Sequence, residues 1–395
     1  MNKKFDIIVY GATGFTGSLC VKYLQENYSD LRWGIAGRNQ EKLEALSKKL
    51  GLNCEIFIAD GNDLPALNEI TKQTKVVLTT AGPFHKYGSK LVASCVTNST
   101  HYVDITGENF WVKEMIEKHH EEAKKKGVRI IPSCGYDSVP SDLGCFFAAK
   151  SFDKAISSIH SFHAWKGEAS GGTIETMFLS RKAAANKSSF GKFALNPKGS
   201  VSTKQKELTS DRVSVHYNNS VGAWVGPFIM AMANTRVVRR GAALLEEIGE
   251  GYGKDFVYKE HAYYSSAKTA YITTALLAFV GLVIATPLNR LVRPFLRKPG
   301  QGPDQKARDS GFFKCTFVVK GKNGEEKIYG LRGSGDPGYK VTSKLVCESA
   351  ISLLGDGSLL PGGALWGGLL TPSSGLGNVL VERLKKTGIV FEEIP

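Results

Sequence analysis

The feature that most constrains the fold is a run of three glycines close to the start of the chain. Residues 5–10 are an apolar run suited to a strand buried on both faces, and residues 18–25 have the apolar spacing of a helix. Between them stands Gly11-Ala-Thr-Gly14-Phe-Thr-Gly17. A strand, a G-x-x-G-x-x-G turn and a helix in this order are typical of a dinucleotide-binding unit.

Each of the three glycines has a predicted task in this turn. Gly11 would make the tight turn, Gly14 would let the backbone approach a pyrophosphate, and Gly17 would let the helix pack closely on the strand. The pyrophosphate would bind the unpaired N–H groups at the positive end of the helix. The alternative is a tight strand-to-helix turn without a ligand. The predicted cofactor-binding residues of the turn are Gly11, Thr13, Gly14, Phe15, Thr16 and Gly17.

The end of the second predicted strand indicates which cofactor the turn holds. Residues 31–36 (LRWGIA) form this strand, and Gly37-Arg38-Asn39 follow it. A site that prefers NAD often has Asp or Glu here, because a carboxylate bonds the ribose 2′-hydroxyl and repels a 2′-phosphate. A guanidinium instead grips that phosphate with paired hydrogen bonds. Arg38 therefore favours NADP(H), the alternative being an ordinary solvated arginine.

Two further strand ends add candidates for the same crevice. The strand at 55–59 ends at Asp60, which is either a contact for the adenine amino group or a cap for the following loop or helix. The strand at 75–80 is followed by Ala81, Gly82 and Pro83. Ala81 and Gly82 would line the nicotinamide half of the cofactor, and Pro83 is assigned to the cofactor site with them.

The alternation of strands and helices continues to about residue 150. Predicted helices at 89–97 and 112–126 separate the strand at 75–80 from those at 100–105 and 128–132. Such an alternation is typical of a parallel sheet with helices on its faces. We therefore predict an α/β fold, with a Rossmann-type doubly wound parallel sheet in residues 1–150 that binds NADP.

Several motifs together resemble one known family. The motifs are GATGFTG, AGRNQEKL, TTAGPFHKYGSKLVASCV, THYVDITGE and IIPSCGYDSVPSDLG, with GGALWGGLLTPSSGLGNVLVERLKKTGIVFE at the carboxyl end. They resemble the saccharopine dehydrogenase-like oxidoreductases, which include animal members and the bacterial trans-acting enoyl reductases of lipid biosynthesis. The resemblance covers nearly the whole chain and implies a Rossmann domain, a nicotinamide cofactor and a reductase-like role near lipid. Its animal members look associated with lipid droplets and other membranes.

Hydride transfer also needs a proton donor near the ends of the central strands. Tyr136 and Asp137 follow the strand at 128–132, so that Tyr136 would donate a proton and Asp137 would orient it or a ligand. Alternatively, Asp137 and Ser138 cap the next helix. Tyr87 is the third catalytic candidate. Weaker candidates are Phe84, His85 and Glu108, and a Tyr-x-x-x-Lys match at Tyr264 and Lys268 that lies far beyond the sheet.

The rhythm of the chain changes from about residue 151. A strand at 155–165 alternates polar and apolar residues, and a helix is expected over 173–185, followed by an exposed loop at 186–205. Asn323-Gly324 between two strand-like runs is a strong hairpin signal. We predict a second, mixed α+β domain over 151–340 that binds the substrate, and elements in 341–395 that return to the Rossmann domain.

An apolar segment interrupts this second domain. Residues 269–289 carry no charged side chain, and the basic residues Arg290, Arg293, Arg297 and Lys298 follow. A monotopic membrane contact over 269–298 would place the basic flank on anionic headgroups, and we favour this interpretation. A buried core helix is the alternative. A spanning helix is less favoured, because it would put the Asn-Gly hairpin across a bilayer from the Rossmann sheet.

Composition limits the partners and the compartment. A net charge of +14 favours acidic partners such as a phosphorylated cofactor or an anionic lipid surface, while no nucleic-acid-binding motif is found. Seven widely spaced cysteines without a C-x-x-C pair predict neither a disulfide framework nor a zinc site, and they favour a reducing compartment. The start of the chain has no apolar run typical of a secretory signal.

These observations lead to one main hypothesis and two rivals. We expect an NADP(H)-dependent oxidoreductase that reduces a lipophilic enoyl or keto substrate on the cytosolic face of a membrane or lipid droplet, with a homodimer as one expected state of assembly. The first rival is a catalytically inactive nucleotide-binding scaffold at the same surface. The second is a soluble dehydrogenase of amino-acid adducts, which requires a clamp for an anionic substrate.

Overall fold

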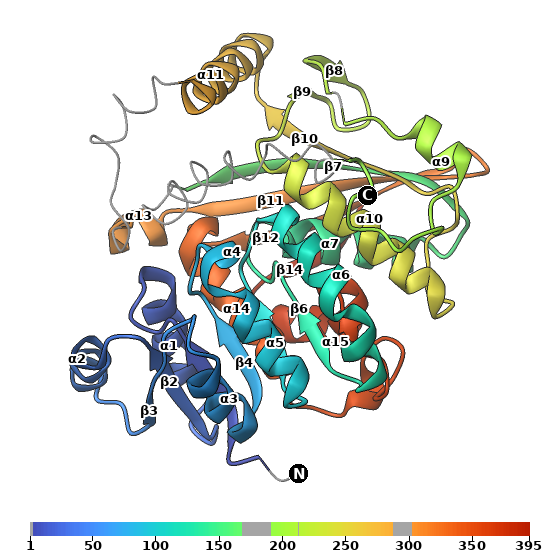
Figure 1. Ribbon diagram of the computed structural model, residues 1–395. Coiled ribbons are helices and arrows are strands. Elements are labelled where there is room, and N and C mark those ends of the chain that lie inside the picture. The colour runs from blue at the N-terminus through green and yellow to red at the C-terminus, as the bar shows by residue number, and fades with distance from the viewer. Residues whose placement is uncertain (1–2, 168–190, 212, 287–301) are drawn as a thin grey trace.

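The computed structural model describes residues 3–167, 191–211, 213–286 and 302–395, and these form two seven-stranded sheets with helices between and around them (Figure 1). The helix expected at 173–185 and the basic residues that follow position 289 lie outside the described residues.

Sheet A is the predicted Rossmann sheet. Its strands are all parallel and follow the order β13-β6-β5-β4-β1-β2-β3. The order reverses between β1 and β4, which is where a ligand crevice opens in such sheets. The strands are β1 (Phe5–Tyr10), β2 (Trp33–Gly37), β3 (Glu55–Ile58), β4 (Thr74–Thr79), β5 (His101–Asp104), β6 (Arg129–Ile131) and β13 (Gly368–Leu369). The predicted fold class is confirmed.

Helices cover both faces of sheet A. Ile7 and Val9 of β1 enter one apolar core with Val21, while Ile8 and Tyr10 enter a second core on the other face. This alternation explains the uninterrupted apolar sequence of the strand. The helices of this half are α1 (Phe15–Asn27), α2 (Gln40–Leu50), α3 (Leu64–Gln73), α4 (Phe84–Tyr87), α5 (Ser89–Thr97) and α6 (Asn109–Lys125).

Sheet B is mixed and follows the order β14-β12-β11-β7-β10-β9-β8. Strands β7 and β10 are parallel, whereas the other neighbours are antiparallel. Gly324, with φ of 85°, stands in the turn between β11 and β12, so the predicted Asn-Gly hairpin is confirmed. The strands are β7 (Ile156–Lys166), β8 (His216–Asn218), β9 (Ala223–Gly226), β10 (Val257–Tyr264), β11 (Phe312–Gly321), β12 (Glu326–Ser334) and β14 (Val390–Ile394).

One apolar core joins the two sheets. It contains Ile7 of sheet A and Phe317 of sheet B, and it runs through the helices between them. A Cβ on Gly144 of α7 would lie 2.3 Å from the Phe317 ring, so the absence of a side chain lets the helix approach β11 closely. The helices of this half are α7 (Val139–Phe152), α9 (Thr203–Leu208), α10 (Ala231–Glu247), α13 (Gln305–Asp309), α14 (Thr342–Ser352) and α15 (Pro372–Lys386).

The last residues of the chain contribute to both sheets. β13 pairs with β6 at the edge of sheet A, and β14 pairs with β12 at the edge of sheet B. The start of α9 at Thr203 differs from the loop expected at 186–205, because Ser202 accepts a hydrogen bond from the Gln205 amide and caps the helix.

Helix α11 (Ala267–Ala285) stands at the edge of the molecule, beside β9 and β10 (Figure 1). The exposed fractions of Leu276, Phe279 and Leu282 are 57%, 59% and 54%. The interpretation of this segment as a buried core helix is therefore wrong for its large described side chains, although Ala270 near its start is buried. Among the described residues, no helix has both the length and the apolar character needed to span a membrane.

Candidate functional site

The glycine turn joins β1 to α1 at the carboxyl edge of sheet A. Gly11 has a φ of 81°, and a Cβ there would lie 2.9 Å from the Ala81 Cβ. A Cβ on Gly17 would lie 2.2 Å from the Gly11 carbonyl oxygen. The packing of the turn therefore requires Gly11 and Gly17. It also brings Ala81, expected at the nicotinamide half, into contact with the start of the turn.

Gly14 differs from the other two glycines. Its φ is −69°, which any residue adopts, and a Cβ there would meet only the Gly11 carbonyl oxygen, at 3.3 Å. Gly14 also precedes α1, and no side chain of the described residues caps the first amides of this helix. Thr13 and Gly14 are exposed and Thr16 is half-buried. The open side of Gly14 and the uncapped amides fit the diphosphate of a dinucleotide.

The side chain of Phe15 points to the second half of the molecule. Its ring packs edge-on against Tyr339, with 5.1 Å between the ring centroids, and the Arg308 guanidinium lies 5.6 Å from the same ring. Because the Phe15 ring is packed against these two side chains, a ligand of the turn would meet the backbone amide of Phe15 and not its side chain.

Arg38, Asp60 and Tyr87 gather at the ends of β2 and β3. Arg38 is exposed, with its guanidinium carbon 5.9 Å from the centre of the Tyr87 ring. The Tyr87 backbone approaches Gly61 so closely that a Cβ on Gly61 would lie 2.9 Å from the Tyr87 carbonyl oxygen. The structure thus places Tyr87 beside Arg38 and Gly61, next to the residues expected on the adenosine side of the crevice.

Asp60 makes a local turn. Its Oδ1 accepts a hydrogen bond of 2.9 Å from the Asn62 amide, while Asp63 caps α3 by accepting from the Ala66 amide at 3.1 Å. The loop-capping alternative for Asp60 is therefore realised, although its carboxylate stays exposed at the crevice edge. Burial raises the pKa of neighbouring Tyr10 to about 12, and the Asp60 charge adds to this rise.

Glu108 braces the loop that follows β4. Its fully buried carboxylate accepts hydrogen bonds from the amides of Phe84 and His85, at 2.9 and 3.0 Å, and lies 2.6 Å from His85 Nδ1. These contacts hold the first turn of α4, which begins directly after Ala81, Gly82 and Pro83. Glu108 is thus a positioning residue for the nicotinamide side of the crevice, a role its sequence position alone does not reveal.

A second buried carboxylate ties the ends of β5 and β6 together. Asp104 accepts hydrogen bonds from the amides of Thr106 and Ser133, at 2.8 and 2.9 Å, and from the Tyr102 hydroxyl at 2.8 Å. Burial raises the pKa of Asp104 to about 7. Asp104 is the last residue of β5 and the last but one of the strand predicted at 100–105, and this place near the strand end was the signal available in the sequence. It holds the loops on which Gly107 and Asp137 stand.

Asp137 is the ionisable group best placed at this end of the crevice. Its Oδ2 would lie 3.5 Å from a Cβ on Gly107, so the carboxyl group sits between the loops after β5 and β6. The side chain is partly exposed, and we find no hydrogen bond to its carboxylate within the part of the chain that the structure describes. Burial raises the pKa of Asp137 to about 6. Ser138 stands at the N-cap position of α7, as the alternative expected, but within the described residues no side-chain capping hydrogen bond is found at this helix.

Tyr136 lies deeper than its neighbour. Its side chain is 8% exposed, and its ring packs edge-on against Phe313 at 5.4 Å. Its hydroxyl has no hydrogen-bond partner among the described residues, and burial raises its pKa well above 10. The Tyr136 amide donates to Thr342 Oγ1 at 3.0 Å. A neutral phenol in this setting gives up a proton only with difficulty.

A buried polar network lies behind the Asp137 loop and was not predicted. Glu260 Oε1 accepts from the Tyr258 hydroxyl at 2.9 Å, and Oε2 accepts from the Asn234 amide group at 3.1 Å. Asn234 Oδ1 accepts from the Ser138 hydroxyl at 3.4 Å. Burial raises the pKa of Glu260 to about 7. The network connects α7, α10 and sheet B, and its members come from segments too far apart in sequence to form a motif.

Other candidates lie away from the crevice. Tyr264 ends β10 and its hydroxyl lies 3.4 Å from the Pro227 carbonyl oxygen, while Lys268 is exposed on α11. The Tyr-x-x-x-Lys match is therefore on sheet B and not at the Rossmann edge. Within the described ranges no three His, Cys, Asp or Glu side chains are grouped to hold a metal ion. All seven cysteines are free thiols.

Comparisons with known proteins identify the family. Residues 7–131 match the model of the saccharopine dehydrogenase NADP binding domain. A Mycobacterium tuberculosis protein with the provisional name of a trans-acting enoyl reductase is 33% identical over 99% of this chain and 97% of its own. A trans-acting enoyl reductase of Mycobacterium ulcerans is 30% identical over 98% of this chain and 97% of its own.

Solved structures show the same fold at much lower identity. Saccharopine dehydrogenase (L-Glu forming) from Saccharomyces cerevisiae aligns over 99% of both chains with a TM-score of 0.56 and 13% identity. A homospermidine synthase from Legionella pneumophila, solved in complex with NAD, aligns over 99% of this chain and 92% of its own, with a TM-score of 0.53 and 11% identity.

The glycine turn, the strand order and the full-length relatives lead to one conclusion. The chain is an NADP-dependent oxidoreductase and belongs to the saccharopine dehydrogenase-like family that includes the mycobacterial trans-acting enoyl reductases.

Proposed function

We propose that this protein reduces the carbon–carbon double bond of a lipophilic enoyl substrate with NADPH. The observation that carries the proposal is the Asp137 carboxyl group, which lies without a hydrogen-bond partner among the described residues beside Gly107 at the carboxyl edge of sheet A. The names of the full-length relatives support the enoyl class. When bound, NADPH supplies the hydride.

Different residues of the chain would bind the cofactor and supply the proton. Uncapped amides after Gly14 hold the diphosphate, and Arg38 with Tyr87 holds the 2′-phosphate side. As the hydride adds to the β carbon, the electron pair of the double bond needs a proton at the α carbon, and Asp137 supplies it. Tyr136 does not donate the proton, because its hydroxyl is buried and its pKa is well above 10. Its role is to support the Asp137 loop.

The coenzyme preference gives the first test. The wild-type protein should oxidise NADPH when a long-chain trans-2-enoyl thioester is added, and should use NADH poorly. Arg38→Ala should weaken NADPH binding by about 10- to 100-fold and leave NADH binding unchanged, since a charge-assisted contact contributes about 1.5–3 kcal/mol. Dissociation constants from quenching of the intrinsic fluorescence, measured with both coenzymes, provide the readout.

Arg32→Ala is the matched control for this test. Arg32 is also an exposed arginine next to β2, but it lies at the opposite end of the strand and pairs with Asp6 at 3.0 Å. The control should bind NADPH like the wild type. Equal NADPH affinity in Arg38→Ala and wild type would contradict the assignment of Arg38. NADPH binding without turnover of any enoyl substrate would favour the nucleotide-binding scaffold instead.

We further propose that α11 rests on the cytosolic face of a membrane or lipid droplet. The support is an exposed apolar surface on Tyr271, Ile272, Leu276, Phe279 and Leu282, all more than half exposed. Apolar side chains of this size are stabilised by transfer out of water, by about 1.5–3 kcal/mol each when fully buried. Four basic residues follow shortly afterwards in the sequence, at positions 290–298, and favour anionic headgroups. A lipophilic substrate would reach the protein from such a surface.

Flotation with lipid vesicles tests the contact. Wild-type protein should float with vesicles that contain anionic lipid, and the triple variant L276N/F279N/L282N should show at least a tenfold lower partition coefficient, because three exposed apolar side chains become polar. The control L359N/L365N changes two leucines that are 70% and 89% exposed outside α11. Equal flotation of wild type and the triple variant would rule out α11 as the contact.

A further inference from the structure

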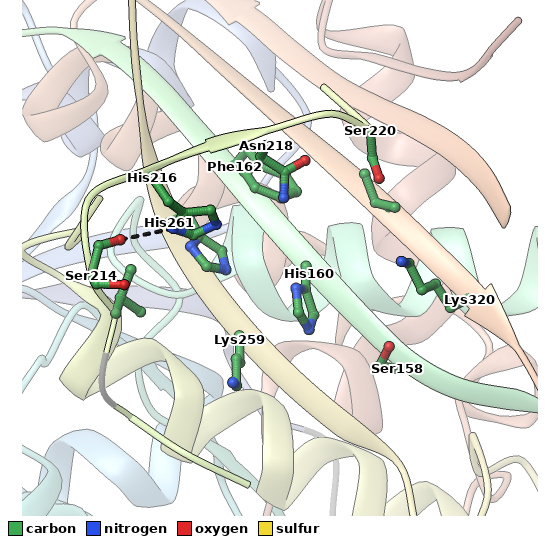
Figure 2. A pocket seen from close by; sticks show the side chains of 12 residues that line it. Ser158, His160, Phe162, Ser214, His216, Asn218, Ser220, Lys259, His261 and Lys320 are labelled. Carbon is green, nitrogen blue, oxygen red and sulfur yellow. Dashed lines mark hydrogen bonds between the residues drawn. The ribbon is translucent and has the colours of Figure 1, made fainter. Parts of the chain in front are cut away.

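The face of sheet B opposite α7 and α10 contains a hollow of about 310 Å³. Residues alternate between the faces of a strand, so Ser161 and His163 of β7 point inward, while Ser158, His160 and Phe162 point to this outer face. Figure 2 shows the labelled side chains gathered from β7, β8, β10 and β11, with Ser214 and Ser220 from the segments on either side of β8. The lining residues are Ser158, His160, Phe162, Val213, Ser214, His216, Asn218, Ser220, Lys259, His261, Val318 and Lys320.

The lining is rich in hydrogen-bond donors and includes no carboxylate. Lys259 has no ion-pair partner among the residues that the structure describes, whereas Lys320 lies 3.1 Å from Glu326 of β12. His216 Nδ1 lies 2.9 Å from the Ser214 carbonyl oxygen, so it donates to that oxygen and leaves Nε2 free to face the hollow. Two ammonium groups would repel a metal cation, and the hollow therefore suits an anion.

His261 is the second, independent sign of a ligand. Its side chain is 5% exposed, yet neither ring nitrogen has a hydrogen-bond partner within the described residues. The ring stacks on Phe162 at 4.9 Å and lies 5.5 Å from the His160 ring and 6.0 Å from the His216 ring. Buried polar atoms in native proteins are nearly always bonded, so two unbonded nitrogens beside a cationic hollow indicate a missing acceptor.

We propose that this hollow binds a phosphate group. A tetrahedral dianion offers acceptor oxygens in several directions, and this matches donors that converge from β7 and β10: the His160 imidazole, and the His261 imidazole with the Lys259 ammonium group. A carboxylate offers its acceptor sites in one plane and therefore matches donors that approach from several directions less well. The phosphate belongs either to a soluble phosphomonoester or to a lipid headgroup, because α11 lies on the neighbouring strands β9 and β10.

The protonation of the imidazoles would couple to binding. The pKa of His160 is lowered to about 4, chiefly by burial and also by the charges of Lys259 and Lys320, while the charge of Glu326 acts in the opposite direction. The pKa of His261 is lowered to about 3, chiefly by burial and also by the charges of His160, His216 and Lys259. A bound dianion favours the protonated imidazolium, so binding should take up a proton and strengthen as the pH falls.

Calorimetry on the full chain saturated with NADPH tests the proposal. Bound NADPH occupies the phosphate-binding part of the Rossmann crevice, so that added anions cannot bind there. Inorganic phosphate and sulfate are the probes, and sulfate keeps its charge between pH 6 and 8, so that any pH effect comes from the protein. We expect one site per chain for each anion, with sulfate bound at least threefold more tightly at pH 6 than at pH 8. Lys259→Met and His261→Phe should each weaken binding at least tenfold.

The variants are chosen to fold. Phenylalanine keeps the stacking of position 261 on Phe162, and methionine keeps the apolar stem of position 259. Lys314→Met is the control, since Lys314 is an exposed lysine near the other end of β11 and does not line the hollow. All three should retain the wild-type NADPH affinity and circular dichroism spectrum. Unchanged anion binding in both Lys259→Met and His261→Phe, or no saturable anion binding in wild type, would overturn the proposal.

Vesicles distinguish the two sources of the phosphate. If a headgroup is the ligand, Lys259→Met should float less than wild type on vesicles that contain phosphatidic acid, and equally on vesicles of phosphatidylcholine. If a soluble phosphomonoester is the ligand, glycerol 3-phosphate should compete with sulfate, and flotation should not change in Lys259→Met. Both results support a phosphate site and differ only in what carries the phosphate.

Discussion

Gly14→Val is expected to reduce NADPH affinity by at least 100-fold while the protein stays folded. Gly14 has an ordinary φ of −69°, and among the described residues the only close neighbour of a Cβ added there would be the Gly11 carbonyl oxygen, at 3.3 Å. The isopropyl group would therefore occupy the space in front of the first amides of α1, where the diphosphate must lie. Titration of NADPH against protein fluorescence measures the loss, and thermal unfolding without cofactor reports on the fold.

Two further glycine variants sharpen this result. Gly355→Val places the same side chain at an exposed glycine whose nearest neighbour to a Cβ is the Ser352 carbonyl oxygen at 3.9 Å, and it should bind NADPH normally. Gly17→Ala should lower the unfolding temperature, because its Cβ would lie 2.2 Å from the Gly11 oxygen. NADPH affinity of Gly14→Val within threefold of the wild type would refute the placement of the diphosphate.

Asp137→Asn should lower kcat for enoyl reduction by about 100- to 10,000-fold, the usual contribution of a general acid, with little effect on NADPH affinity. The asparagine amide keeps the size of the side chain but has no acidic proton. In the wild type, the pKa of about 6 means that the protonated form prevails below that pH. kcat/KM should therefore fall about tenfold per pH unit above pH 6, and the variant should lack this slope.

Tyr136→Phe is the control for the Asp137 assignment. Its hydroxyl makes no hydrogen bond to the described residues, so its removal should leave kcat within about threefold of the wild type. Steady-state rates between pH 5.5 and 8.5 with one enoyl thioester suffice for both variants. A loss in Tyr136→Phe as large as that in Asp137→Asn would return the proton-donor role to the tyrosine.

The sequence contained most of what determines sheet A. The geometry of the turn requires three glycines at fixed spacing, and the burial of both faces requires strands that are apolar throughout. Both requirements can be recognised in the sequence. Strand β1 was predicted with the bounds that the structure shows. The Asn-Gly turn is predictable for the same reason, because the left-handed conformation of Gly324 depends only on the four consecutive residues of the turn.

The supports of the site were much harder to predict, because they depend on contacts between distant segments. Glu108 bonds the amides of Phe84 and His85 from a different loop, and Glu260 meets Asn234 only after sheet B has formed. An acidic residue is usually solvated, so the sequence offered Glu108 only as a weaker catalytic candidate and gave no sign of the buried Glu260 of β10. The same limit applies to Tyr87, whose position beside Arg38 depends on how the α4 turn meets the end of β2.

The shared edge strands have a consequence for how the protein is made. β13 and β14 come from the final 28 residues, 368–395, and close one border of sheet A and one border of sheet B. Because residues 368–395 are synthesised after every other strand, the edges of β6 and β12 in the nascent chain stay unpaired until this segment has left the ribosome. Completion of sheet A in the nucleotide-binding half therefore waits for residues 368–369, although its other six strands are synthesised first.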